Sequence, residues 1–388
     1  MPIYDISPTW RNEVQNKARG GIPTCDNSSI SGDLVAWNQI KTLLEKSQNN
    51  GTSFSNSVVS TYSLVYTTPD AYAGGVLAPN GDIHFIPLNA NRGQKISSSG
   101  VVSTYSLVYT IPSAYIGGVL SPNGDIHFIP VFADRGQKID INGVVSTYSL
   151  VYVEPGKLIY SGGILAPNGD IHFIPRNTSV GQKISINGVV STYSLVYTST
   201  LTNGAYTGGI LAANGDIHFS PRGTDRGQKI NSSGVVSTYS LIYTSTVINL
   251  YYGGVLATNG DIHFVPQNAS VGQKIDINGV VSTYNLVYTL SITGGGGGAY
   301  VGGVLAPNGD VYFIPYSAAV GQKINSLGVV STYSLIYTTP VAYGGGVLNS
   351  NGDIYFIPHA GAVGQKISTF PAKPFNIGLC CSPFLNKF

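Results

Sequence analysis

The sequence predicts an all-β protein, a seven-bladed β-propeller with four strands in each blade. Three short motifs, Asn-Gly-Asp, Gly-Gln-Lys and Val-Val-Ser-Thr-Tyr, recur in the same order along the chain. The third motif occurs seven times, at intervals of 43 to 49 residues. Four short strands at this period are typical of propeller blades. The seven copies of the third motif begin at Val58, Val101, Val144, Val189, Val235, Val280 and Val329.

Within one repeat, each strand has its own signal. Asn-Gly favours positive φ at both positions, so we expect a two-residue hairpin between the first and second strands. A proline cannot donate to a ladder and ends the second strand, while β-branched and aromatic residues favour the fourth. In the first complete repeat these elements are Gly74–Ala78, the turn at Asn80 and Gly81, Asp82–Ile86 before Pro87, Gln94–Ile96 and Val101–Tyr109.

The order of the repeated pieces predicts how the ring closes. The first repeated piece, from Val58, is a fourth strand, and the last, near Ile367, is a third strand. Only a closed ring lets the N-terminal strand complete the last blade and remove exposed sheet edges. We therefore expect an N-terminal extension at 1–57 with one short helix near Leu34–Ser47, a propeller at 58–367 and an irregular C-terminal docking tail at 368–388.

Composition excludes several classes of protein. Charged residues make up 10% of the chain and hydrophobic residues 43%, which excludes a coiled coil and a highly charged disordered chain. No apolar run approaches the ~18 residues of a membrane span. The net charge of +2 gives no basic stripe for nucleic acid. Three cysteines and no signal-peptide pattern lead us to expect synthesis in a cytosol, with reduced thiols.

Length variation between repeats is confined to the connection from each fourth strand to the next first strand. The longest includes the glycine run Gly294–Gly298. In a propeller these connections open on the same face as those between the second and third strands, whose sequences vary at constant length. Variable loops on a rigid scaffold are where binding sites usually lie.

Two sets of residues on that face are candidates for ligand binding. A tyrosine two positions before each Gly-Gly is expected near the mouth of the channel, where it either packs the core or stacks on sugars. Three arginines before Gly-Gln-Lys are either solvated or hold a carboxylate, as an arginine triad does in sialidases. The tyrosines are Tyr72, Tyr115, Tyr160, Tyr206, Tyr251, Tyr300 and Tyr343, and the arginines are Arg92, Arg135 and Arg226.

Other repeated polar residues favour structural roles. Each Asn-Gly-Asp aspartate is expected to cap its turn or bond the lysine of its blade rather than bind calcium. Five histidines share one position of the second strand, which Tyr312 and Tyr355 occupy in the last two blades. A swap of histidine for tyrosine suits packing better than metal ligation. We expect no cofactor, no metal and no catalytic residue, because no Ser-His-Asp or paired-carboxylate arrangement can be assembled from the sequence.

The repeat phrase Gly-Gly-Val-Leu-Ala-Pro-Asn-Gly-Asp-Ile-His-Phe-Ile-Pro resembles propeller repeats in proteins of large DNA viruses that infect algae and other protists. The run from Phe375 to Phe388 is similar to an ending found in such proteins. This resemblance implies a non-enzymatic structural or surface component of the virion, made in the host cytoplasm, which binds other virion or scaffold proteins. Apolar tail residues would dock it, and we single out Trp37, Phe375, Phe384 and Phe388.

Two further hypotheses belong to other classes. The tyrosines and variable loops are compatible with a lectin-like module that binds glycans or attaches to a host. A glycan hydrolase is the weaker alternative, because the sequence lacks the sialidase Ser-x-Asp-x-Gly-x-Thr-Trp box.

Overall fold

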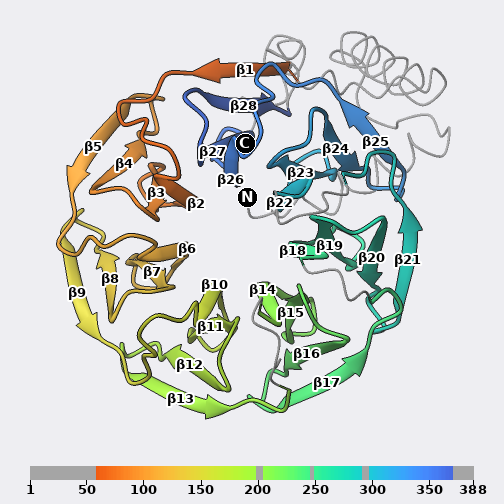
Figure 1. Ribbon diagram of the computed structural model, residues 1–388, viewed down its shortest axis with the longest axis horizontal. Helices are drawn as coiled ribbons and strands as arrows, with labels where there is room; N and C mark the ends of the chain where they lie inside the picture. Colours follow the sequence, from red (N-terminus) through yellow and green to blue (C-terminus); the bar gives the residue numbers. More distant parts are fainter. Residues whose placement is uncertain (1–57, 198–203, 245–248, 291–296, 370–388) are drawn as a thin grey trace, which may run out of the picture. The chain divides into compact units, whose positions relative to one another are not determined.

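The structure, a computed structural model, describes residues 58–197, 204–244, 249–290 and 297–369. These residues belong to one compact unit, Ser57–Ala372. The expected helix near 34–47 and the four proposed docking residues (Trp37, Phe375, Phe384 and Phe388) lie outside the described residues. Figure 1 shows seven separate sheets arranged in a ring about a central axis.

Each sheet has four antiparallel strands, and in six sheets they run from the axis outward in chain order, whereas in the seventh the outermost strand is β1. The innermost strands are β2 (Tyr72–Leu77), β6 (Tyr115–Leu120), β10 (Tyr160–Leu165), β14 (Tyr206–Leu211), β18 (Tyr251–Leu256), β22 (Tyr300–Leu305) and β26 (Tyr343–Leu348). The second strands are β3 (Ile83–Pro87), β7 (Ile126–Pro130), β11 (Ile171–Pro175), β15 (Ile217–Pro221), β19 (Ile262–Pro266), β23 (Val311–Pro315) and β27 (Asp353–Pro358).

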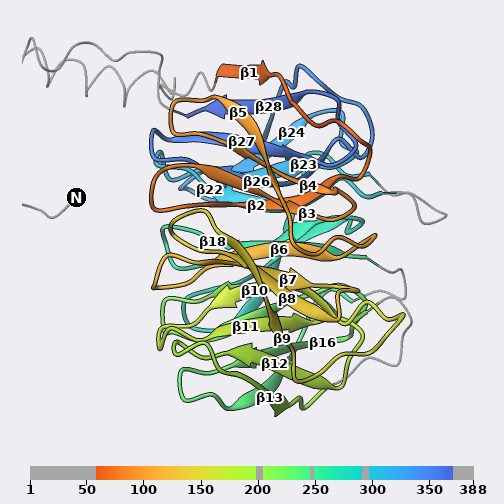
Figure 2. The same ribbon diagram turned by 90° about the vertical axis from the view of Figure 1, so that its left-hand side faces the viewer.

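The third strands are β4 (Arg92–Ile96), β8 (Arg135–Ile139), β12 (Val180–Ile184), β16 (Arg226–Ile230), β20 (Val271–Ile275), β24 (Gly321–Ile324) and β28 (Gly364–Ser368). The outermost strands are β5 (Val102–Ser106), β9 (Val145–Ser149), β13 (Val190–Ser194), β17 (Val236–Ser240), β21 (Val281–Asn285), β25 (Val330–Tyr333) and β1 (Val58–Tyr62). Blades are numbered one to seven from β2 onward. Seen from the side in Figure 2, β5 and β9 run across the outer surface of the ring.

The predicted closure of the ring is confirmed. β1 pairs antiparallel with β28, from Val58 opposite Ser368 to Tyr62 opposite Gly364, and so completes the seventh blade. The fold class is therefore all-β, with seven blades of four strands. The described part of the chain contains no helix and therefore no helix that could span a membrane.

The tight turns differ from the expected two-residue hairpin. Gly81 donates its amide to the Ala78 carbonyl at 3.0 Å, and Ala78 donates to Asp82 at 2.8 Å. Only Gly81 has a positive φ, at 85°, while Asn80 does not. This is a three-residue loop, a type I turn whose glycine forms a bulge. Asn-Gly suits either turn, so the dipeptide alone could not decide between them.

The innermost strands approach one another so closely that only glycine fits. The first glycine of each Gly-Gly has a positive φ, and a Cβ on Gly208 would lie 3.0 Å from the Cα of Gly253 in the next blade. The same close approach occurs at every junction except that between Gly302 and Gly345. A register shift between Tyr72 and Gly75, repeated in each blade, turns the backbone into this position.

The hydrophobic core lies between neighbouring blades. Val76 and Ile86 of the first blade form one cluster with Tyr115 and Phe128 of the second. The second strands are buried along their whole length. The sequence alone did not show whether these strands are fully buried or half-buried. Each large apolar side chain buried here contributes about 1.5 to 3 kcal/mol, so the ring is held by seven similar interfaces rather than by one central core.

A buried glutamine also links each blade to its predecessor. The Gln182 side chain is completely buried, and its Oε1 accepts the amides of Val151 and Tyr152 at 3.1 and 2.8 Å. Those amides belong to the segment that leaves the outermost strand of the preceding blade. Equivalent bonds join the remaining junctions through Gln94, Gln137, Gln228, Gln273, Gln322 and Gln365.

We expect Gln182→Leu to lower the free energy of unfolding by about 2 to 4 kcal/mol, because it leaves two buried amides without an acceptor. Denaturant titration measures this loss. The matched control is Gln267→Leu, since Gln267 is also buried but its Oε1 has no partner among the described residues. Equal losses in the two variants would contradict the assigned role of Gln182.

Candidate functional site

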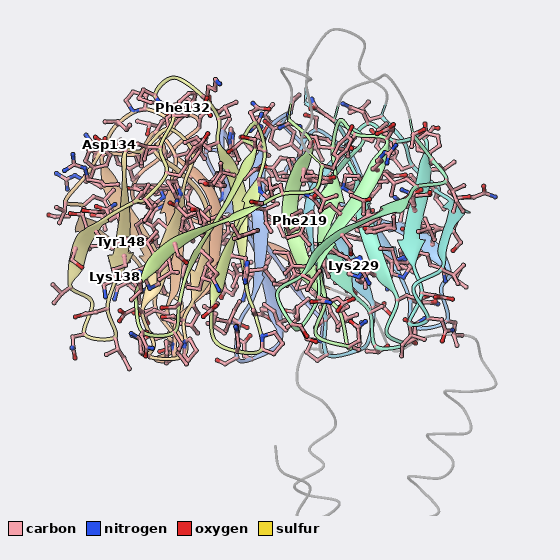
Figure 3. All side chains as sticks on the ribbon, turned by 90° about the horizontal axis from the view of Figure 1, so that it is seen from below. Phe132, Asp134, Lys138, Tyr148, Phe219 and Lys229 are labelled. Atoms are coloured by element: carbon pink, nitrogen blue, oxygen red, sulfur yellow. The ribbon has the colours of Figure 1, made fainter. Side chains whose placement is uncertain are left out.

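The two ends of the blades form two different faces. We call the end with the connections between second and third strands the loop face, and the end with the two tight turns the turn face. Figure 3 shows Phe132 and Asp134 on the loop face and Lys138 toward the opposite end. On the turn face every blade repeats one set of polar contacts, whereas the loop face departs from the repeat.

An aspartate and a lysine brace the turn face of each blade. Lys95 Nζ lies 2.7 Å from Asp82 Oδ2, and Asp82 Oδ1 accepts the Ser98 amide at 3.1 Å. The carboxylate thus ties the first tight turn to the second. Its side chain is 10% exposed, and the hydrogen bonds from Lys95 and Ser98 lower the pKa of Asp82 despite the opposing effect of burial. The expected structural role of these aspartates is confirmed.

The histidines are packing residues held beside a tyrosine. His84 contacts the Tyr105 ring edge-to-face at 5.4 Å, and Tyr105 in turn covers Gly93, where a Cβ would meet the ring at 2.1 Å. Burial, together with the charge of Lys95, lowers the pKa of His84 to about 4. The same pKa applies to His127, His172, His218 and His263. Each imidazole is therefore neutral at pH 7.

The seven candidate tyrosines do not line the channel. Tyr72 and its equivalents are at most 1% exposed. Tyr72 packs against Phe85 at 5.4 Å, and its hydroxyl donates to the Arg92 carbonyl at 3.0 Å. A ring without an exposed face cannot stack on a sugar, so the stacking interpretation is corrected in favour of packing. The bulge between Tyr72 and Gly75 turns the side chain into the blade.

The three candidate arginines do not converge. Arg92, Arg135 and Arg226 are exposed at the first residue of β4, β8 and β16, and Figure 1 places β16 in another sector of the ring. Arg135 pairs with Asp134 at 2.8 Å and lies 4.6 Å over the Tyr109 ring. An arginine triad for one carboxylate is therefore wrong for these residues.

Backbone hydrogen bonds form a belt around the mouth of the ring on the loop face. Leu88 donates to the Ala71 carbonyl at 2.8 Å, and its own carbonyl accepts the amide of Ala114 in the next blade at 3.0 Å. The pattern continues from blade to blade as far as His359. Between the last blade and the first, His359 Nδ1 instead lies 2.9 Å from Asp70 Oδ1.

Side chains depart most from the repeat at one position of this belt, directly after the proline of each second strand. Its occupants share neither size nor charge. In blade order they are Leu88, Val131, Arg176, Arg222, Gln267, Tyr316 and His359. We call these seven residues the mouth residues. An alignment of the repeats shows the variation, but the sequence does not show that the backbone belt gathers them around one opening.

Two mouth residues on adjacent blades carry positive charge. Arg176 follows β11, Arg222 follows β15, and burial lowers the pKa of both guanidinium groups. The charge of Arg176 further lowers the pKa of Arg222, which is about 10, so both remain protonated at pH 7. Arg222 Nε donates to Asn249 Oδ1 at 2.5 Å. Neither arginine is among the candidate ligand-binding residues predicted from the sequence.

Small cavities recur on the turn face, between neighbouring blades. The cavity between the third and fourth blades has a volume of about 200 Å³ and is lined by Asn168, His172, Lys183, Tyr193 and Ser232, among others. Cavities of about 190 and 170 Å³ lie at the next two junctions, and one of only about 50 Å³ lies between the second and third blades. Among the described residues, no three His, Cys, Asp or Glu side chains gather where a metal ion could be held.

Comparison with known proteins shows the fold. No protein-family model matches the sequence, and no curated protein matches it. A streptogramin B lyase is 19% identical with a TM-score of 0.64, and 80% of this chain covers 97% of it. A catalytically inactive virginiamycin B lyase from Staphylococcus aureus, with quinupristin, is 16% identical with a TM-score of 0.68, over 81% and 100% of the two chains.

The WD40 propeller domain of Doa1 is 12% identical with a TM-score of 0.60, over 82% and 99% of the two chains. The similar structures thus include enzymes and a WD40 domain. At these identities the likeness extends to the propeller fold alone.

The histidines predict acid sensitivity in a defined range. A folded pKa of about 4 lies below the unfolded value of 6.5, so the unfolded chain gains protons first and stability falls as pH drops from 6.5 to 4. Each histidine contributes up to about 3 kcal/mol of this loss. Thermal unfolding between pH 7 and pH 4.5 measures it.

The chain supplies its own control, because Tyr312 and Tyr355 occupy the same position. Replacing all five histidines by tyrosine should flatten the profile between pH 6.5 and 4.5. Both proteins should still lose stability below pH 4, because the pKa of Asp82 and that of Asp170 are lowered in the folded protein. Parallel profiles above pH 4.5 would show that other groups cause the sensitivity.

Proposed function

We propose that this protein is a non-enzymatic structural component of a virion that binds neighbouring proteins through the outer surface of its ring. The observation that carries the proposal is an apolar position that is exposed in every blade. It lies two or three residues after the end of the outermost strand, and each residue there is 60% to 62% exposed. These rim residues are Val65, Val108, Val151, Val196, Ile242, Val287 and Ile336.

The rim residues stay apolar although exposure alone would permit polar replacements. Other positions of the repeat vary freely, since the residue before Gly-Gly is Ala73, Ser161 or Tyr252 in different blades. The backbone of each rim residue is fixed by its glutamine, as Val108 donates to Gln137 Oε1 at 3.1 Å. An apolar side chain held outward at regular intervals suits packing against a neighbouring protein.

The polar side chains of the repeat support a non-enzymatic role, because the framework already uses them. Aspartate and lysine pair across the tight turns, glutamine joins the blades, and most of the buried tyrosines donate to backbone carbonyls. The virion is the assembly that the sequence resemblance implies. The tails outside the described residues would add further docking segments.

We expect Val108→Lys combined with Val151→Lys to reduce incorporation into particles several-fold without unfolding the ring. The measurement is quantitative mass spectrometry of density-purified particles. Ser106→Lys with Ser149→Lys is the control, since these serines are exposed on the same outermost strands. Incorporation of the valine variant at the control level would refute the rim as a docking surface, and absence of the wild-type protein from particles would refute the virion role.

A lectin-like module is the second candidate, and the cavities on the turn face favour it. Amide, imidazole and ammonium groups beside a tyrosine are suited to sugar hydroxyls and ring faces. Repetition around the ring would give multivalent binding. A lectin of this kind would bind glycans on the face opposite to the one that the sequence suggested.

If the cavities bind sugars, Ser232→Trp should fill the one between the third and fourth blades and lower the binding stoichiometry by one site. A glycan array identifies the sugar, and calorimetry gives the stoichiometry. Ser179→Trp on the loop face of the third blade is the control, because Ser179 is exposed and lines none of these cavities. An array without any bound glycan would exclude this second candidate.

A further inference from the structure

Arg176 and Arg222 have hydrogen-bonding capacity that the described part of the protein does not use. Arg176 Nε and Arg222 Nη1 are both buried without a hydrogen-bond partner. Among the described residues, the one side-chain hydrogen bond of the pair joins Arg222 Nε to Asn249 Oδ1, and it fixes the orientation of that guanidinium. Buried donors without partners are costly and mark a place where a partner is missing.

The described residues also give the pair no counter-charge. In the described ranges neither arginine forms an ion pair, and the acidic residues of the loop face have other contacts. Asp134 pairs with Arg135, and Glu154 pairs with Lys157. Asp225 accepts the Tyr197 hydroxyl at 3.0 Å, and Asp70 lies beside His359. The segments 198–203, 245–248 and 291–296 contain no Asp or Glu at all.

Neighbouring side chains make one side of the mouth polar. Tyr252 and Tyr316 lie close enough to Arg222 for their charges to affect its pKa. Tyr316 also contacts the His359 ring at 5.7 Å, while Leu88 and Val131 make the first two blades apolar. Gly204 leaves room for the Arg176 side chain, because a Cβ on residue 204 would lie 2.4 Å from Cγ of Arg176.

We propose that Arg176 and Arg222 form a binding site for an oxyanion, the carboxylate or phosphate group of a small ligand, at the mouth of the ring. Two guanidinium groups offer forked N–H donors that match such groups. A bound anion would supply both the missing hydrogen-bond partners and the missing charge. The site lies on the loop face, apart from the rim residues and the turn-face cavities, and does not rest on the proposed function.

Isothermal titration calorimetry of the full chain with inorganic phosphate in low-chloride buffer tests this site. We expect one bound phosphate, and a dissociation constant at least tenfold higher in Arg176→Gln and in Arg222→Gln. Arg92→Gln and Arg226→Gln are the controls, because both arginines are exposed on the same face. Parallel titrations with glucuronate and acetate distinguish a sugar acid from a bare carboxylate. Only the sugar ring of glucuronate could also contact Tyr252 and Tyr316.

Thermal unfolding separates a binding role from a structural one. Without ligand, Arg176→Gln should melt at the wild-type temperature or above it, because the change removes repulsion and breaks no hydrogen bond. Added phosphate should raise the melting temperature of the wild type and of the controls only. Absence of anion binding by the wild type, equal binding by the arginine variants, or a lower melting temperature of Arg176→Gln with unchanged binding would each overturn the proposal.

Discussion

The close approach of the innermost strands is the constraint on which the rest of the structure depends. Seven strands converge at the axis, and the glycine of one blade lies against the glycine of the next, as Gly208 does against Gly253. Side chains cannot occupy this layer. The large residues of each blade therefore lie farther out, in the interfaces between blades. Near the axis, side chains can vary from blade to blade only where the strands end, at the mouth.

The sequence predicts the fold because the repeat counts the blades and its order defines the closure. The position of Val58 ahead of the first complete repeat already implies the pairing with Ser368 that the structure shows. Local details escaped prediction for physical reasons. Asn80-Gly81 is compatible with two kinds of turn, and the direction of Tyr72 depends on a bulge that no residue type announces.

The candidate site was harder to predict, because only the closed ring brings residues from different blades together at one opening. Arg92 and Arg226 both precede Gly-Gln-Lys, which made them candidates for one shared site. Their strands nevertheless lie in different sectors of the ring. Arg176 and Arg222 each directly follow the proline that ends a second strand, so the sequence places them at the start of an ordinary loop. The backbone belt, formed between residues far apart in the sequence, brings that position to the mouth.

The closure by β1 also decides when the fold can be completed. β1 is made before any complete blade, but its partner β28 is the last strand of the described residues. The first strand must therefore remain unpaired until synthesis reaches residue 364, and joining ends so far apart costs on the order of 5 kcal/mol of chain entropy. During that interval the nascent chain exposes the edges that the finished ring protects. The pairing of β1 with β28 can therefore form only after residue 364 has been made, and fast docking would shorten the time for which these edges are exposed.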